Sequence, residues 1–159
     1  MKLTSYTNYA LRCLQLAALK HPELVRVDDV CLIHKVSRAH IVKVVHVLGK
    51  AGYLETVRGR GGGFRLGRPA ESIKVGEVVR LTEGPLEIVE CFNPEKNTCP
   101  LIGICELSTK LQEATNAFMK VLDSVTIADI VANRSPLLSR IELLENPKKS
   151  TECSENTKH

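Results

Sequence analysis

The sequence lacks three patterns that would place it in other classes of protein. It has no apolar run near the roughly 18 residues of a membrane-spanning helix, and its start, MKLTSYTNYALRCL, does not have the shape of a signal peptide. We therefore expect a cytoplasmic protein with no membrane partner. It shows no acid, base and nucleophile arranged for catalysis, which argues against an enzyme and against a small-molecule substrate. Its six cysteines include no Cys-x-x-Cys pair, a common half of a zinc site.

Charge is divided unevenly along the 159 residues, a length that suggests one domain or a small domain with an arm. Residues 1–68 contain 12 Lys and Arg against 4 Asp and Glu, whereas residues 69–159 contain 10 against 14. A basic half joined to a mildly acidic half is typical of a nucleic-acid-binding protein with a separate control region. A charged surface that is merely solvated would give the same totals, so charge alone does not distinguish a nucleic-acid-binding protein from other soluble proteins.

Two helices are predicted at the start of the basic half. Residues 5–19 and 27–34 both place apolar residues on one face with the helical period of about 3.6 residues. Cys13 and Cys31 fall on these apolar faces. We expect both cysteines in the core, as small hydrophobic residues, rather than at a metal site.

A third helix with an outward row of basic and polar residues is predicted directly after Ser37, a good N-cap. With the preceding helix and the tight turn between them it forms a helix-turn-helix, whose second helix enters the major groove of DNA. We expect Ser37, Arg38, His40 and Lys43 to contact DNA, although an ordinary solvated helix face would carry the same residues.

Residues 53–69, YLETVRGRGGGFRLGRP, predict a β-hairpin with a glycine-rich tip. Glycines let the backbone approach a phosphate or a narrow groove, and Arg58, Arg60 and Arg65 supply positive charge beside Gly61. A nucleotide-phosphate loop is a weaker interpretation, because the Gly-Lys-Ser/Thr ending is missing. A helix-turn-helix followed by a basic hairpin is a winged helix, so the expected partner is double-stranded operator DNA.

A long amphipathic helix is predicted over residues 106–124, after a short one over 75–83. Its apolar residues recur about every 3.5 positions, the period of a coiled-coil seam, which favours a homodimer over packing within one chain. The seam consists of Leu107, Leu111, Ala114, Phe118, Val121 and Val125. A capping box from Thr126 to Asp129 opens a last short helix. The fold class is therefore mainly α with a small β-hairpin wing, a winged helix-turn-helix domain preceding a long dimerisation helix.

Three cysteines, Cys91, Cys99 and Cys105, share a segment that proline, asparagine and glycine keep irregular. Disulfides are disfavoured in a reducing cytosol, and a nucleophilic thiol needs a base, which is not seen here. Zinc is possible but prefers closely paired ligands. Soft thiolates at wide, unequal spacing fit an iron–sulfur cluster better. Three thiolates on a four-iron cube leave one iron weakly held, which suits a sensor more than an electron carrier.

These motifs resemble those of the Rrf-type winged-helix transcriptional regulators over about residues 1–138. The likeness rests on KLTSYTNYALRCL, VRGRGGGFRLGRP, the three-cysteine loop and TIADIV. It implies a dimeric repressor with one [4Fe–4S] cluster per subunit, bound through Cys91, Cys99 and Cys105. In the nitric-oxide-sensing subtype (NsrR) an aspartate from the other subunit is the fourth ligand. The matching residue here is Asn8, a poorer iron ligand.

The cluster-biogenesis subtype (IscR) has a histidine after the third cysteine, where this sequence has Glu-Leu-Ser. TNYA, ECF, CPLIGIC and NAFMKVL instead resemble the iron-responsive rhizobial subtype (RirA). That likeness implies a repressor of iron-uptake genes, sensitive to iron and oxygen, with nitric-oxide sensing as the alternative. The expected division is a DNA-binding domain over 1–84, a cluster loop over 85–105, the dimerisation and C-terminal helices over 106–138, and a disordered polar tail over 139–159.

Overall fold

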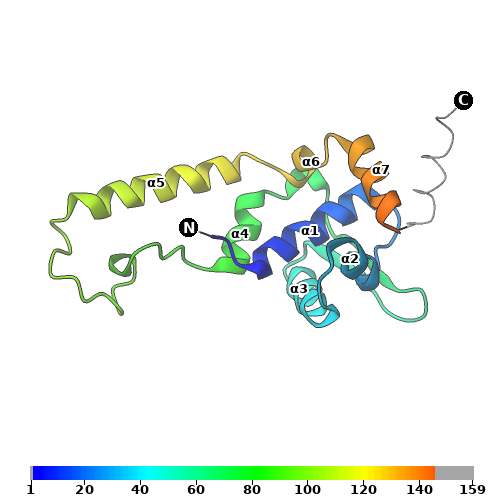
Figure 1. Cartoon of the computed structure of the whole chain (residues 1–159), viewed down its shortest axis with the longest axis horizontal. Coiled ribbons are helices and arrows are strands. Elements are labelled where there is room, and N and C mark those ends of the chain that lie inside the picture. The colour runs from blue at the N-terminus through cyan, green and yellow to red at the C-terminus, as the bar shows by residue number, and fades with distance from the viewer. Residues whose placement is uncertain (1, 146–159) are drawn as a thin grey trace, which may run out of the picture.

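The computed structural model describes residues 2–145, and the tail expected to be disordered lies outside them from residue 146 on. The helices are α1 (Ser5–Lys20), α2 (Val27–His34), α3 (Arg38–Lys50), α4 (Val75–Glu83), α5 (Glu106–Asp123), α6 (Ile127–Ile130) and α7 (Arg134–Glu145), with 3₁₀ turns η1 (Ala70–Ser72) and η2 (Glu90–Phe92). Strands β1 (Leu54–Val57) and β2 (Gly63–Leu66) form one hairpin. The other helices pack around α1, while α5 extends away from them with the preceding loop alongside (Figure 1).

The core is built around α1. Its residues Ala10, Cys13, Leu14 and Ala17 are fully buried, and the helix contacts α3, α4, β2 and α6. Three of these side chains are small, so the neighbouring elements approach α1 closely and leave little void. The prediction that Cys13 lies in the core is confirmed, and burial raises the pKa of its thiol to about 12. Cys31 is half-buried and packs against the same core.

The turn of the helix-turn-helix is formed as the sequence predicted, with one difference in its capping. Lys35 ends α2 in the left-handed conformation, with φ of 53°, and its N–H donates to the carbonyl of Cys31. Ser37 occupies the N-cap position of α3, but its hydroxyl does not cap the helix. The Ser37 Oγ instead lies 2.9 Å from Nδ1 of His40, which fixes the imidazole beside the start of the helix.

The hairpin is held to the helices by main-chain hydrogen bonds. Its strands pair antiparallel, with Glu55 opposite Arg65, and Phe64 in β2 is fully buried. Val25, between α1 and α2, exchanges two main-chain hydrogen bonds of 2.8 Å with Phe64 and forms an isolated antiparallel β-bridge with it. A Cβ at Gly63 would collide with the carbonyl oxygen of Val25, so glycine is required for this close approach. The wing therefore has a fixed position relative to α2 and α3.

The C-terminal end of α5 is fastened to the DNA-binding half. Ile127 donates its main-chain N–H to Ile73, and Val75 donates to Val125, both at 2.9 Å. The guanidinium of Arg80 binds both carboxylate oxygens of Asp123 at 2.6 Å. The remainder of α5 projects outward, and Leu107 and Val121 of the predicted seam are 65% and 62% exposed.

The chain differs from the prediction at its C-terminal end. Residues 139–145, assigned from the sequence to a disordered tail, continue helix α7 up to Glu145. These residues are held to the rest of the fold at two points: Ile141 packs against the core, and Glu145 forms an ion pair with Lys20 of α1. The prediction ended the helical part of the chain too early, because α7 buries only a narrow strip of its surface. The capping box of Thr126 and Asp129 is present as predicted, at the start of α6. Within residues 2–145, no helix is long and apolar enough to cross a membrane.

Two glycine substitutions should change stability in opposite directions. Gly63→Ala should lower the free energy of unfolding by about 1–3 kcal/mol, because the added methyl displaces the Val25 main chain. Gly49→Ala in α3 should raise it by about 0.5–1 kcal/mol, since its Cβ meets only ordinary contacts and alanine favours a helix. Urea titrations followed by circular dichroism measure both values, and a stabilised Gly63→Ala protein would contradict the packing described.

Candidate nucleic-acid interface and cysteine loop

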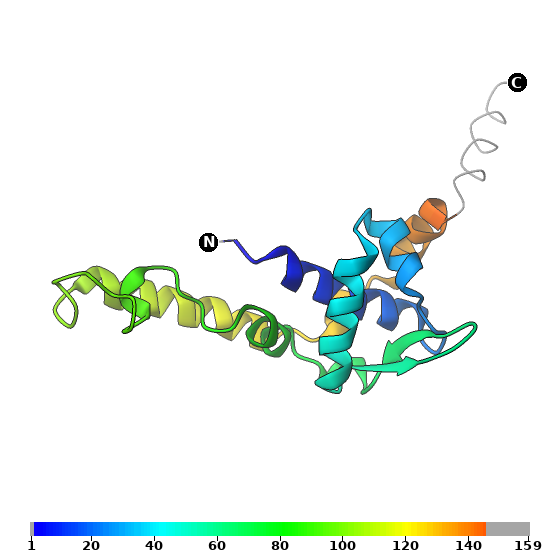
Figure 2. The same ribbon diagram turned by 90° about the horizontal axis from the view of Figure 1, so that it is seen from below.

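Helix α3 presents its predicted DNA-contacting residues to solvent. Ser37, Arg38, His40 and Lys43 are all exposed, whereas Ile41 and the other apolar residues of the helix face the core. Figure 2, seen from below, shows α3 crossing in front of α1, with the hairpin projecting beside it. Arg38 lies 3.0 Å from Asp28, but both side chains are largely exposed, so this ion pair contributes little to stability. Contact of these four residues with DNA stays a prediction.

Two tyrosines of α1 support α3 from behind. The hydroxyl of Tyr6 donates to the main-chain carbonyl of Lys43 at 3.5 Å. The ring of Tyr9 stacks on His40, with ring centres 6.0 Å apart and planes inclined by 26°. Both tyrosines lie within residues 5–19, the first helix predicted from the sequence, for which no function was predicted. Their role could have been predicted from the sequence, because two aromatic residues three positions apart lie on one face of a helix that packs on the recognition helix.

The wing arginines have different surroundings. Arg58 and Arg60 are exposed at the tip and, within the described residues, neither takes part in an ion pair. Arg65 instead binds both oxygens of Glu55 across the hairpin, at 2.8 and 3.0 Å. These hydrogen bonds lower the pKa of the Glu55 carboxyl, which therefore stays ionised beside the guanidinium. We expect Arg65 to offer DNA less net charge than the two tip arginines. Gly61, with φ of 82°, forms the turn between them and β2.

The three loop cysteines lie where the sequence predicted, but not at one point. Cys91 is in η2, Cys99 is in the irregular segment after it, and Cys105 is the N-cap of α5. Each is half-buried, and the Sγ of Cys91 lies 3.3 Å from the hydroxyl of Ser108. Among residues 2–145, no three His, Cys, Asp or Glu side chains are close enough together to hold a metal ion.

The donor chemistry of the loop nevertheless suits an iron–sulfur cluster. Three thiols lie on a segment with little regular structure, and apolar side chains project between them. Leu101, Ile102 and Ile104 are 52%, 51% and 79% exposed, so their burial would accompany any closure of the loop. Thiolates in an apolar shell are typical ligands of iron–sulfur clusters. The loop thus has the residues for such a site, although as folded it does not gather them.

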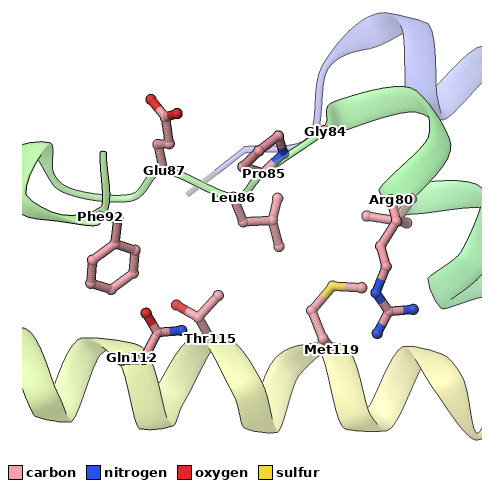
Figure 3. A pocket seen from close by; sticks show the side chains of 10 residues that line it. Arg80, Gly84, Pro85, Leu86, Glu87, Phe92, Gln112, Thr115 and Met119 are labelled. Carbon is pink, nitrogen blue, oxygen red and sulfur yellow. The ribbon is translucent and has the colours of Figure 1, made fainter. Parts of the chain in front are cut away.

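The start of the loop stands off from α5 and leaves an open pocket of about 530 Å³ between them. Leu86 and Phe92 line it from the loop, and Gln112, Thr115 and Met119 line it from α5 (Figure 3). Its walls are mainly apolar. A small shift of the loop toward α5 would bring these apolar walls into contact. The loop is therefore less tightly packed than the helices on either side of it.

Asn8 lies near the junction of α1 and α4, where the loop begins. Its side chain is exposed, while Thr4, the N-cap of α1, and Thr7 within α1 bind Glu83, the last residue of α4. The main-chain N–H and the hydroxyl of Thr4 donate to Glu83 Oε1 at 2.7 and 3.0 Å, and the hydroxyl of Thr7 donates to the same oxygen. Burial acts to raise the pKa of Glu83, but these hydrogen bonds outweigh it and the pKa is lowered.

Comparison with known proteins identifies the family. A family model named Rrf2 and described as an iron-dependent transcriptional regulator matches residues 3–133. The chain belongs to the Rrf2 family. The NsrR regulator of Bacillus licheniformis is 49% identical over 135 residues, covering 84% of this chain and 94% of that protein. The NsrR regulator of Bacillus subtilis is 44% identical over 146 residues, covering 91% and 100%.

Solved structures of Rrf2 regulators share the fold. The structure of T. potens IscR matches with a TM-score of 0.68 at 23% identity, over 86% of this chain and 90% of that one. The expected family and the mainly helical winged-helix fold are confirmed. This Rrf2 chain is a transcriptional regulator and not an enzyme. The relatives above carry the NsrR name, so they favour the subtype that the sequence ranked second.

Removal of one tip charge tests the wing as a phosphate contact. Arg60→Ala should weaken binding to every DNA sequence alike and reduce the slope of log affinity against log salt by about 0.9, the value for one phosphate. Arg65→Ala should change that slope less, because Glu55 already neutralises Arg65. Fluorescence anisotropy across a salt series measures both variants, and equal slopes for them would contradict the assignment.

Acid titration tests the Glu83 contacts. Since its pKa is lowered on folding, ionised Glu83 stabilises the protein above the ordinary value of 4.5, and this contribution is lost as pH falls through the lower folded value. Glu83→Gln should therefore unfold at lower urea concentration than the parent at pH 7, with the difference shrinking below pH 4.5. The exposed Glu71→Gln is the control. A difference that persists unchanged in acid would rule out the charged contacts as its cause.

Proposed function

We propose that this chain is a transcriptional repressor of the NsrR type, in which a [4Fe–4S] cluster held by Cys91, Cys99 and Cys105 makes operator binding sensitive to nitric oxide. One observation carries the proposal: the three-cysteine loop joins the helix-turn-helix unit to α5, in a chain 49% identical to a regulator named NsrR. A bound cluster would supply a reactive iron that nitric oxide attacks.

The protein's own part in sensing is to hold the three sulfurs and to respond when they are released. Cys105 occupies the N-cap position of α5, and Cys91 follows α4 after a short irregular segment. Bringing the thiolates together would therefore fix the position of α5 relative to α4. The pocket beside Leu86 and Phe92 gives the loop room to make that movement. Loss of the cluster would then loosen the loop while leaving the core around α1 intact.

A second copy of the chain is the expected partner of α5. Leu107, Ala114 and Val121 are exposed at intervals of one heptad, the spacing of a seam between two helices. Leu111 and Phe118, which complete the seam, are half-buried against the same chain. A homodimer about this seam would present two recognition helices to two half-sites of an operator, separated by about one or two helical turns of DNA.

Contacts within the chain offer a route from the loop to DNA. Arg80 binds Asp123 of α5, and Gly76 packs so closely on Asp123 that a Cβ has no room. At the other end of α4, Glu83 holds the first turn of α1. The tyrosines of α1 then contact α3. A change in the loop or in α5 would therefore shift α1 and the recognition helix together.

Iron sensing, which the sequence alone favoured, becomes the second candidate. It is kept because Asn8 stands where a carboxylate ligand would be expected. A neutral amide would leave the fourth iron of the cube weakly held, and that iron would be lost first when iron is scarce. On this reading, three cysteines alone hold the cluster and the repressed genes serve iron uptake. The proposed division of the chain is the same for both candidates, with DNA binding in 1–84, the cluster loop in 85–105 and the dimerisation and C-terminal helices in 106–138.

Anaerobic purification and operator binding distinguish these candidates. The protein should be brown, and stoichiometric nitric oxide should weaken operator binding by roughly 5- to 150-fold, the range of typical coupling free energies. Cys99→Ala should be colourless and bind as weakly as the nitrosylated parent. Cys31→Ala, which removes a half-buried thiol outside the loop, should behave as the parent.

Three other outcomes of these experiments would contradict the proposed function in different ways. Release of DNA on addition of an iron chelator, with little response to nitric oxide, would favour iron sensing. A colourless protein with bound zinc would rule out the cluster. A cluster-free Cys99→Ala protein that binds its operator as tightly as the parent would contradict the coupling between loop and DNA, whichever signal is used.

A further inference from the structure

One apolar side chain stands in the middle of the exposed basic face of α3. Val42 is 44% exposed, whereas Ile41, Val44 and Val45 on either side of it are buried in the core. Most of its neighbours on the outer surface are polar or charged, among them Lys43, and Arg38 and His46 one turn away on either side. The exception is Ala39, whose side chain is a single methyl group. Because the helix already packs through another face, Val42 has no evident role in holding the fold.

Valine at this exposed position lowers the stability of the helix, and its few contacts with the core do not offset that loss. β-Branched residues are poorer helix formers than alanine, by up to roughly 0.7 kcal/mol on an exposed helix surface. Single exposed apolar residues are common and need no special explanation. Val42 is different because it lies in the second turn of the helix whose first turns are expected to reach the base edges.

The major groove contains one apolar group that such a side chain can recognise. Of the four base-pair orientations, only those with thymine present a methyl group, at C5, among hydrogen-bond donors and acceptors. Ala39 lies one turn before Val42 on the exposed surface and has only a methyl side chain, so it lets the helix approach the base edges closely. Lys43 and Arg38 flank Val42 with positive charge, which attracts the phosphates on both sides of the groove.

We propose that Val42 is a specificity-determining residue that reads the 5-methyl group of one thymine in each half-site of the operator. The proposal rests on the DNA-binding part of the proposed function and is independent of the cluster and of the signal. Contacts of Lys43 and Arg38 with phosphates would position the helix without carrying sequence information. The contact of Val42 would instead distinguish thymine from uracil, two bases with the same hydrogen-bonding groups.

Replacement of thymine by uracil tests this contact without disturbing any hydrogen bond. The cluster-loaded full chain first selects duplexes from a random-sequence library, and the enriched duplex serves as the probe. Each thymine is then replaced by uracil in turn, and affinity is measured by fluorescence anisotropy at fixed salt. For the parent protein, one position in each half-site should lose about fourfold in affinity, the equivalent of one methyl group removed from water.

Two protein variants, combined with the uracil substitution in the DNA, complete a double-mutant cycle. Val42→Ala should bind the parent duplex less tightly and should show a uracil effect close to onefold at the same position, because the contact is already absent. Leu81→Ala is the matched control, since Leu81 is 40% exposed but lies on α4. It should keep the fourfold uracil effect.

The results separate this inference from the proposed function. If the library yields no enriched sequence, DNA recognition itself fails. If a sequence is enriched but no uracil position is sensitive, or if Val42→Ala keeps the parent's sensitivity, the protein binds DNA and Val42 does not read a methyl group. Sensitivity that disappears in Val42→Ala and persists in Leu81→Ala supports the assignment.

Discussion

The close packing of α1 is the constraint on which the other elements depend. Its buried face carries Ala10, Cys13 and Ala17, small side chains that bring the recognition helix, α4 and the wing within contact of one helix. Each of those elements is short and would not be stable alone. Because they share one support, they cannot move independently, and any force applied to α1 reaches the DNA-facing surface.

Stability is distributed unevenly around this support. The core residues of the DNA-binding half are almost completely buried, whereas the cysteine loop has exposed apolar residues, a pocket beneath it and few regular hydrogen bonds. Such a segment can rearrange at low free-energy cost while the core keeps its structure. This division suits a regulator, since a sensing segment must respond to its ligand and a recognition surface must keep its geometry.

Much of the fold follows from local sequence signals. The bounds of α2 and α4 agree with those predicted, since amphipathic periodicity and terminal signals such as Gly84 are local properties. The ion pair of Arg65 with Glu55 depends on hairpin register, which side-chain patterns alone leave open. The hydrogen bonds from Thr4 to Glu83 join positions far apart in the chain, so local sequence patterns could not predict them. Helix α7 was missed beyond residue 138, because only a few of its side chains, such as Ile141, pack on the core, and that packing depends on tertiary contacts. The positions of the three loop sulfurs depend on a loop with few restraints, so spacing predicted their chemistry and not their geometry.

The hydrogen bonds between Val25 and Phe64 have a consequence for the DNA rather than for the protein. They fix the hairpin to the segment that leads into the helix-turn-helix, so the distance between the recognition helix and the wing tip is set before binding. When the spacing of the major and minor grooves does not match this distance, the duplex has to bend or change its groove width. The energy of that deformation depends on base steps, including steps that no side chain touches. If α3 and the wing contact DNA as proposed, this fixed spacing would select operators by their flexibility as well as by their bases.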